Sequence, residues 1–415
     1  MARPNKKRTS TGSSEPTSNE PPDTLSRFFS AGVVAAVYFG LALIYFIPAF
    51  LPGRHLFGTD YLAAGYFSHE FVAGRLTAGA LPKWIPYIFG GLPMFANPGS
   101  AFFPVTLVSA FVLPVKDLFP VIYVFQFFLA GLGMYLLVQE LGVRPWIAFL
   151  AGLAFQFTGL PMSFVFAGHD GRIIVATLAP LYLFFLHRGV RTGHLAAFAG
   201  AAATMGLALL SFQIQLAYYL LFAAAAWVIF AFVHLGTWRD GRGFAKRLLL
   251  GMGSVAFAFA LASVNFLPFK DYVAQSPRGG AEGRGYAYST SYSMPPGEIV
   301  GLAVPEQYGI DITNVNTGKA QFPPYHGKSP FKLHTEYVGA FVVALLFLGF
   351  LYGRRNRYWW FFAGLTAVAL SVAFGGFTPL FRLYYAVLPE FKRFRAPNLT
   401  FFLVSTSLVA MAALT

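Results

Sequence analysis

The stretch Phe119–Gln139, FPVIYVFQFFLAGLGMYLLVQ, contains no charged side chain and decides the fold class. At 1.5 Å per residue, about 20 apolar residues in a helix cross the hydrocarbon core of a bilayer. Further apolar stretches follow along the chain. The sequence therefore predicts an all-α integral membrane protein, a polytopic bundle of about ten transmembrane helices with long extracytoplasmic loops. The predicted spans are 30–51, 119–139, 145–168, 172–187, 195–211, 215–234, 247–267, 337–353, 357–374 and 399–415.

The composition excludes a soluble domain of this size. Hydrophobic residues make up 56% of the 415 residues and charged residues 11%, and the mean hydropathy is +0.59. A net charge of +14 would suggest nucleic acid for a soluble protein. Here the basic residues lie largely in the N-terminal tail and in short loops, so we expect membrane lipids and no nucleic acid among the partners. The chain has no cysteine, which excludes disulfides and thiolate chemistry.

Basic residues in the short loops predict the orientation. Cytoplasmic loops of membrane proteins carry an excess of Lys and Arg. If the N-terminus is cytoplasmic, the Arg-rich short loops all fall on the cytoplasmic side. We therefore expect an inner (plasma) membrane protein with two long extracytoplasmic loops, at about 52–118 and 268–336. The basic loop residues are Arg144, Arg188, Arg191, Arg239, Arg242, Lys246, Arg247, Arg354, Arg355 and Arg357.

Acidic residues gather on the opposite side of the predicted membrane. A charge at mid-bilayer costs about 2.5–3.5 kcal/mol on insertion scales, so spans without acids are the default. Acids concentrated at one face suggest chemistry at the outer surface rather than ion conduction. Eleven of the sixteen acidic residues have this placement: Asp60, Glu70, Asp117, Asp170, Asp271, Glu282, Glu298, Glu306, Asp311, Glu336 and Glu390.

The chain divides into a tail and one membrane domain. Residues 1–28 are polar and rich in Ser, Thr and Pro, which predicts a disordered cytoplasmic tail. Residues 29–415 form the predicted polytopic domain. The sequence stops at Thr415 within an apolar run, which suggests a chain truncated at its C-terminus.

Asp60 is the first candidate for chemistry. It follows the first span in LFGTDYLAAGYFSHEF (56–71), with Glu70 further along a predicted amphipathic helix at 61–78. A carboxylate at the membrane edge can take the proton of an acceptor hydroxyl. The structural alternative is that Thr59 or Asp60 caps the N-terminus of that helix.

The motif GHDGR (168–172) is predicted to be a tight outer turn. His169 and Asp170 could hold a metal or orient a phosphate, and Arg172 adds a cation. Two ligands are too few to define a metal site. The alternative is a polar turn between two spans in which glycine supplies unusual backbone angles.

The motif FKRFRAPN (391–398) places Lys392, Arg393 and Arg395 on the outer face, against the usual charge bias. Because the planar guanidinium suits phosphate oxygens, a bound anion is one explanation. Headgroup binding or pairing with outer acids is the other. The motif HTEYVG (334–339) adds His334 and Glu336 at the outer end of a span, as a weaker candidate for the same site.

Together these motifs resemble the YfhO-like family of bacterial membrane proteins, within the GT-C glycosyltransferase superfamily. The resemblance rests on GTD (58–60), GHDGR, SFQIQ (211–215) and FRAPN (394–398), in this order. Two longer stretches also carry it, LPKWIPYIFGGLPMFANP (81–98) and YSMPPGEIVGLAVPEQYG (292–309).

The resemblance implies a glycosyltransferase that moves a sugar, with inversion, from a polyprenyl-phosphate donor to an extracytoplasmic lipid, glycopolymer or protein acceptor. Asp60 would be the catalytic base, with Glu70, His169, Asp170 and Glu336 in support. Arg395, Arg393 and Arg172 would bind the phosphate. The superfamily's second acidic motif would match Asp170, but here the pair is His–Asp, so the need for a divalent cation such as Mg²⁺ or Mn²⁺ stays open.

Two other functions compete with this one. A flippase or transporter would be expected to carry ionisable residues at mid-span and internal repeats, and neither is evident in the sequence. A non-enzymatic envelope protein would tolerate the loss of Asp60.

Overall fold

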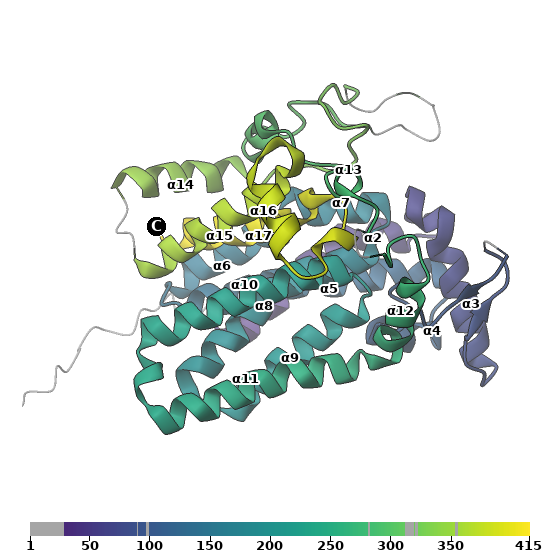
Figure 1. Ribbon diagram of the computed structural model, residues 1–415. Coiled ribbons are helices and arrows are strands. Elements are labelled where there is room, and N and C mark those ends of the chain that lie inside the picture. Colours follow the sequence, from purple (N-terminus) through teal and green to yellow (C-terminus); the bar gives the residue numbers. More distant parts are fainter. Residues whose placement is uncertain are drawn as a thin grey trace, which may run out of the picture.

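The computed structural model describes residues 29–88, 90–96, 99–280, 283–311, 319, 323–352 and 356–415. The predicted tail 1–28 lies outside the described residues, as do Glu282, Arg354 and Arg355. Figure 1 shows long helices running side by side, with short helices and loops gathered mainly at one end of the bundle. Within the described part, the strands form only a two-residue antiparallel pair, β1 (Trp84–Ile85) and β2 (Leu92–Pro93).

Six helical segments are long and apolar enough to cross a membrane. The chain is therefore an all-α, multi-pass membrane protein, as predicted. The segments are α2 (Ala31–Phe50), α5 (Val115–Glu140), α6 and α7 together (Pro145–Gln156 and Gly159–Ala167), α8 (Asp170–Thr192), α10 (Ile214–Leu235) and α11 (Gly241–Leu261).

The remaining predicted spans also contain helices, and these are shorter. They are α9 (Leu195–Leu210), α14 (Ala340–Tyr352), α15 (Arg357–Ala373) and α17 (Phe401–Ala413). Ten crossings therefore remain a prediction. The short elements between the long helices are the π-helix η1 (Tyr61–Gly65), α3 (Tyr66–Thr77), α4 (Pro104–Ala110), η2 (Thr237–Arg239), α12 (Ser263–Ala274), α13 (Tyr286–Ser289), η3 (Pro296–Leu302), η4 (Gly375–Phe377), α16 (Leu380–Val387), η5 (Phe391–Arg393) and η6 (Pro397–Thr400).

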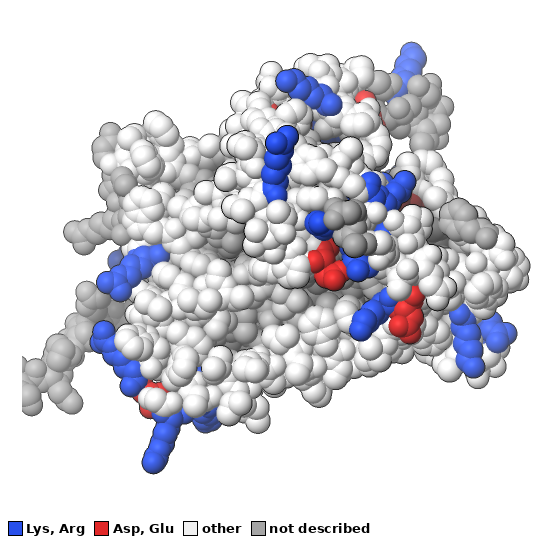
Figure 2. Space-filling model, viewed as in Figure 1, with Lys and Arg blue, Asp and Glu red and all other residues white. Residues whose placement is uncertain are grey.

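The core lies around α5, α8 and α17. Nearly every residue of α17 is buried, and the apolar side chains of α5 and α8 pack against each other along most of their length. In contrast, α11 buries only Ser254 and Ala258 and exposes its apolar side chains, as expected for a helix that faces lipid. On the face in Figure 2, charged side chains gather toward the ends of the long helices, and the surface between those ends is largely uncharged.

The predicted span 145–168 is interrupted. Its helix breaks at Phe157–Thr158, where Thr158 is extended, and α7 then begins at Gly159. The backbone N–H of Gly159 donates to the carbonyl of Tyr337 at 2.7 Å, and the backbone N–H of Thr335 donates to Ser163 Oγ at 3.0 Å. The first bond satisfies a backbone N–H that the break would leave unpaired, and the second ties the distant segment to α7.

The boundaries predicted for the span 172–187 are wrong. The helix α8 begins at Asp170, two residues after the left-handed Gly168 that ends α7, and continues to Thr192, where the left-handed Gly193 caps it. It is therefore 23 residues long and contains Pro180. The motif GHDGR is a helix start, and only its first two residues form the connection.

Candidate functional site

Two glycines bring the loop after α2 against the connection between α7 and α8. A Cβ at Gly58 would lie 2.4 Å from the carbonyl oxygen of Phe166, so no larger residue fits without movement. Gly168 has φ +84°, and a Cβ there would lie 2.8 Å from the backbone nitrogen of Tyr61. Glycine is thus required on both sides of the contact. The contact places Asp60 beside His169.

Tyr61 anchors the residue that follows Asp60. Its side chain is fully buried, its hydroxyl donates to the carbonyl of Val165 at 3.0 Å, and it also contacts the hydroxyl of Tyr123. Tyr61 begins the π-helical turn η1, and such turns occur frequently at functional sites. Asp60 itself has helical backbone angles, and its side chain makes no capping hydrogen bond. The capping alternative for Asp60 is therefore wrong, and its carboxylate is directed elsewhere.

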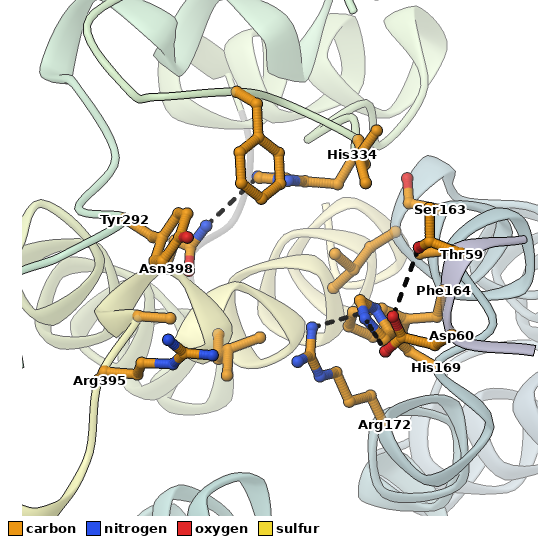
Figure 3. A pocket seen from close by; sticks show the side chains of 16 residues that line it. Thr59, Asp60, Ser163, Phe164, His169, Arg172, Tyr292, His334, Arg395 and Asn398 are labelled. Atoms are coloured by element: carbon orange, nitrogen blue, oxygen red, sulfur yellow. Dashed lines mark hydrogen bonds and ion pairs between the residues drawn. The ribbon is translucent and has the colours of Figure 1, made fainter. Parts of the chain in front are cut away.

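Asp60, His169 and Arg172 form a hydrogen-bonded chain (Figure 3). Arg172 Nη1 lies 3.0 Å from His169 Nδ1, and His169 Nε2 lies 3.0 Å from Asp60 Oδ2. A guanidinium only donates, so Nδ1 must accept and the imidazole proton sits on Nε2, facing the carboxylate. The other oxygen, Asp60 Oδ1, receives a long hydrogen bond of 3.4 Å from Thr59. That oxygen remains available to a substrate.

Near neutral pH, their surroundings keep Asp60 and His169 each in a single protonation state. The hydrogen bond from His169 and the nearby charge of Arg172 lower the pKa of Asp60 below its ordinary value of 3.8. Burial lowers the pKa of His169 below 6.5, although Asp60 acts in the opposite direction. The carboxylate is therefore ionised and the imidazole neutral.

Asp60, His169 and Arg172 line a cavity of about 280 Å³. Figure 3 shows Arg172 and Arg395 reaching toward the cavity from opposite sides, with His334 on a third side. A carboxylate, two guanidiniums and two imidazoles thus converge on one space. The lining residues are Thr59, Asp60, Leu160, Ser163, Phe164, Ala167, His169, Arg172, Tyr292, Phe331, Leu333, His334, Arg395, Ala396, Asn398 and Leu399.

A hydrogen bond to its backbone carbonyl holds Arg395 in place. Its carbonyl accepts a hydrogen bond from Gln215 Nε2 at 2.5 Å, which connects the motif SFQIQ to the motif FRAPN. The next residue, Ala396, has φ +54°, and the neighbouring Tyr292 has φ +60°. Such angles are uncommon for residues other than glycine, and strained positions of this kind cluster at ligand sites. The backbone N–H of Ala396 donates to the carbonyl of Ser291 at 3.0 Å, which stabilises the turn.

His334 connects the cavity to a buried ionic cluster. Its Nε2 lies 3.1 Å from Glu336 Oε1, and Lys332 Nζ lies 2.7 Å from Glu336 Oε2 and 2.5 Å from Glu298 Oε2. Burial alone would raise the pKa of Glu336, but His334 and Lys332 outweigh it and lower that pKa to about 2. Glu336 is thus ionised near neutral pH, orients His334 and does not itself line the cavity.

Asp170 points away from Asp60. Its carboxylate accepts a hydrogen bond from Ser100 Oγ and lies 3.9 Å from His69 Nε2. His169, one residue earlier, faces Asp60 instead, so the two neighbours do not converge on one ligand. Across the described residues, no group of three or more His, Cys, Asp or Glu side chains is arranged to hold a metal ion.

Glu70 and Arg393 also lie outside the cavity. Glu70 is exposed on α3 and borders a separate open groove with Lys83 and Trp84. Arg393 pairs with Glu390 three residues earlier. The structure therefore brings together Asp60, His169, Arg172 and Arg395 of the predicted residues, with Glu336 acting through His334.

Several residues at the site were not singled out from the sequence. Ser163, Tyr292 and Asn398 line the cavity, and Lys332 and Glu298 support Glu336. Tyr292 and Asn398 fall within motifs that carry the resemblance, whereas Ser163 lies in an apolar span with no distinguishing pattern.

No protein-family model matches the chain, and no curated protein matches it. What the site does must therefore be inferred from its residues.

Proposed function

We propose that this cavity is the active site of a membrane glycosyltransferase of GT-C type, related to the YfhO-like proteins. It would transfer a sugar from a polyprenyl-phosphate donor to an extracytoplasmic acceptor, with inversion. The single observation that carries the proposal is the cavity that Asp60 shares with the guanidiniums of Arg172 and Arg395. A general base beside two phosphate-binding groups is what transfer from a sugar phosphate requires.

Each of the charged residues at the cavity has a separate role in the proposed reaction. The acceptor oxygen attacks the anomeric carbon while the bond from that carbon to the phosphate oxygen breaks. The acceptor proton moves to Asp60, whose second oxygen is held by His169. The bonding electrons stay on the phosphate, where Arg172 and Arg395 stabilise the developing charge. One displacement through an oxocarbenium-like state inverts the anomeric configuration.

The topology that goes with this function has about ten crossings, a cytoplasmic N-terminus and the cavity on the outer side of the plasma membrane. The helical breaks and short outer elements around the cavity support it, because irregular backbone in membrane proteins lines cavities. The apolar surfaces between the helices would accommodate the lipid of the donor. A glycopolymer, lipid or protein would serve as acceptor.

The test is sugar transfer by the purified protein in proteoliposomes. Labelled sugars on polyprenyl phosphate are supplied with candidate acceptors, and the anomeric configuration of the product is read by NMR. Inverted product formed by the wild type and lost in Asp60→Asn would support the proposal. Movement of the donor between leaflets without transfer would favour the flippase instead. No product with any donor and acceptor would count against an enzyme.

A further inference from the structure

Three arginines surround one tyrosine beside the cavity. The guanidinium carbons of Arg284, Arg278 and Arg395 lie 4.5, 5.5 and 5.7 Å from the ring centre of Tyr288. Arg395 also lies 5.8 Å from the ring of Tyr292. Arg278, Arg284 and Arg395 are together called the arginine cluster here. Arg278 follows α12, Arg284 precedes α13, and Arg395 lies between η5 and η6.

In the part of the chain that the structure describes, the arginine cluster has no carboxylate partner. Within the described residues, none of its three guanidiniums forms an ion pair, although Arg393 close by is paired with Glu390. All three arginines are exposed. A tyrosine ring attracts one cation over its face, but three cations at one ring repel each other. The N–H fork of each guanidinium matches the oxygens of a phosphoryl group, which would offset this repulsion.

The backbone holds the arginine cluster against the motif FKRFRAPN. Ser289 Oγ donates to the carbonyl of Lys392 at 3.3 Å, and a Cβ at Gly283 would lie 2.3 Å from that same carbonyl oxygen. The hydroxyl of Tyr288 is buried and has no hydrogen-bond partner in the described structure. The ring that the guanidiniums share is therefore fixed, with a polar atom unsatisfied.

We propose that the arginine cluster is a second phosphoryl subsite, adjacent to the one in the cavity. Arg395 belongs to both, because it lines the cavity and also stacks on Tyr288. A ligand with two phosphoryl groups in series would place one between Arg172 and Arg395 and the next on Arg278 and Arg284. The second group comes either from the donor, which would then be a diphosphate-linked form of the polyprenyl-phosphate sugar, or from the headgroup of a neighbouring anionic lipid. The first source rests on the proposed function, but binding itself does not require catalysis.

The test is calorimetric titration of the purified protein in phosphatidylcholine nanodiscs with inorganic pyrophosphate and inorganic phosphate. Pyrophosphate should bind roughly tenfold or more tightly than phosphate, since each added charge-assisted hydrogen bond is worth about that factor. The variant Arg278→Gln/Arg284→Gln should reduce pyrophosphate affinity to that of phosphate. The matched control is Arg382→Gln, because Arg382 makes the same kind of contact with a different ring, that of Tyr286.

A second arm identifies the source of the phosphoryl group. Phosphatidylglycerol retained by the protein is counted by native mass spectrometry for the wild type and for the double variant. Loss of pyrophosphate binding supports the donor as source, and loss of retained phosphatidylglycerol alone supports the lipid headgroup. Equal behaviour of wild type and double variant in both arms, including no binding in either, overturns the subsite. A protein inactive in sugar transfer can still pass this test, so the two proposals fail separately.

Discussion

His169 holds Asp60 through a 3.0 Å contact between its Nε2 and the carboxylate oxygen Oδ2, from a position just before the first turn of α8. The imidazole is in turn oriented by Arg172. Asp60 is therefore an oriented carboxylate in which His169 holds one oxygen and the other accepts only a long hydrogen bond from Thr59. This asymmetry suits a base that must face an acceptor hydroxyl from one side.

Replacing Asp60 by Asn should abolish the proposed transfer. Loss of a general base lowers kcat by about 10²–10⁴-fold, while the amide preserves the volume and the contact with His169. The matched control is Glu70→Gln, an exposed acid on α3 outside the cavity, which should stay within about twofold of wild type. The measurement is the initial rate of sugar transfer by each variant and by wild type at matched expression. Equal rates for wild type and Asp60→Asn would remove Asp60 from the mechanism.

Activity should fall in acid because of His169. Burial lowers the pKa of His169 from 6.5, so its neutral form predominates at pH 7. As the pH falls through that lowered pKa, a proton on Nδ1 disrupts the contact with Arg172. The pKa of Asp60 is already below 3.8, so Asp60 does not titrate in this window. The profile of kcat/KM from about pH 5 to 8 should show an acid limb in wild type.

The variant His169→Asn tests the origin of that limb. Asparagine can still donate to Asp60 but does not titrate, so the acid limb should disappear while a lower, flat activity remains. An unchanged limb in His169→Asn would assign it to another group.

Replacing Arg395 should affect the transfer rate far more than replacing the nearby Arg393. Arg395 lines the cavity, so Arg395→Ala should lower kcat by about 10²–10³-fold through lost stabilisation of the phosphate. Arg393 pairs with Glu390, and Arg393→Ala should change the rate by less than about threefold. Transfer kinetics on the two variants, with melting temperatures to check folding, make the comparison. Similar losses in both would indicate a general charge effect.

Removing the buried cation Lys332 should destabilise the protein. Lys332→Met leaves Glu298 and Glu336 buried without their shared partner, which costs about 3–5 kcal/mol. Adding Glu298→Gln to this variant should restore part of the loss, because one uncompensated charge is removed. Thermal unfolding in nanodiscs measures both variants. An unchanged melting temperature for Lys332→Met would show that water reaches these groups.

Glu336 should contribute stability that is lost in acid. Its folded-state pKa of about 2 lies below the ordinary 4.5, so the ionised form stabilises the fold fully above pH 4.5. That contribution disappears as the pH falls from 4.5 toward 2. Comparing the melting temperatures of wild type and Glu336→Gln across this window checks it. Parallel curves for the two proteins would contradict the low pKa.

Much of the site could be predicted because hydropathy assigns loops to sides of the membrane. Asp60, His169, Arg172 and Arg395 are far apart in sequence, but their loops were all assigned to one face, and they do line one cavity. The sequence could not show which of the two neighbours, His169 or Asp170, faces Asp60. Successive residues at a helix start point about 100° apart, so only the packing of neighbouring loops decides which faces Asp60.

The helix boundaries were less predictable, for two physical reasons. At the break, the backbone N–H of Gly159 is satisfied by the distant carbonyl of Tyr337, and the hydropathy of the local stretch cannot reveal this contact. The ends of α8 carry charges such as Asp170 and Arg191, which lower the local hydropathy and shorten the predicted span. Here glycine caps are the better boundary signal.

The tight approach of Gly58 and Gly168 has a mechanical consequence. Backbone meets backbone there, so the segment that carries Asp60 has no freedom to swing independently of the helix pair α7 and α8. Any tilt of α8 within the bilayer would therefore move Asp60, His169 and Arg172 together as one rigid body. Bilayer thickness, which sets helix tilt, would then shift this unit as a whole relative to Arg395 on the opposite wall, and so adjust the width of the cavity without disturbing the Asp60–His169 pair.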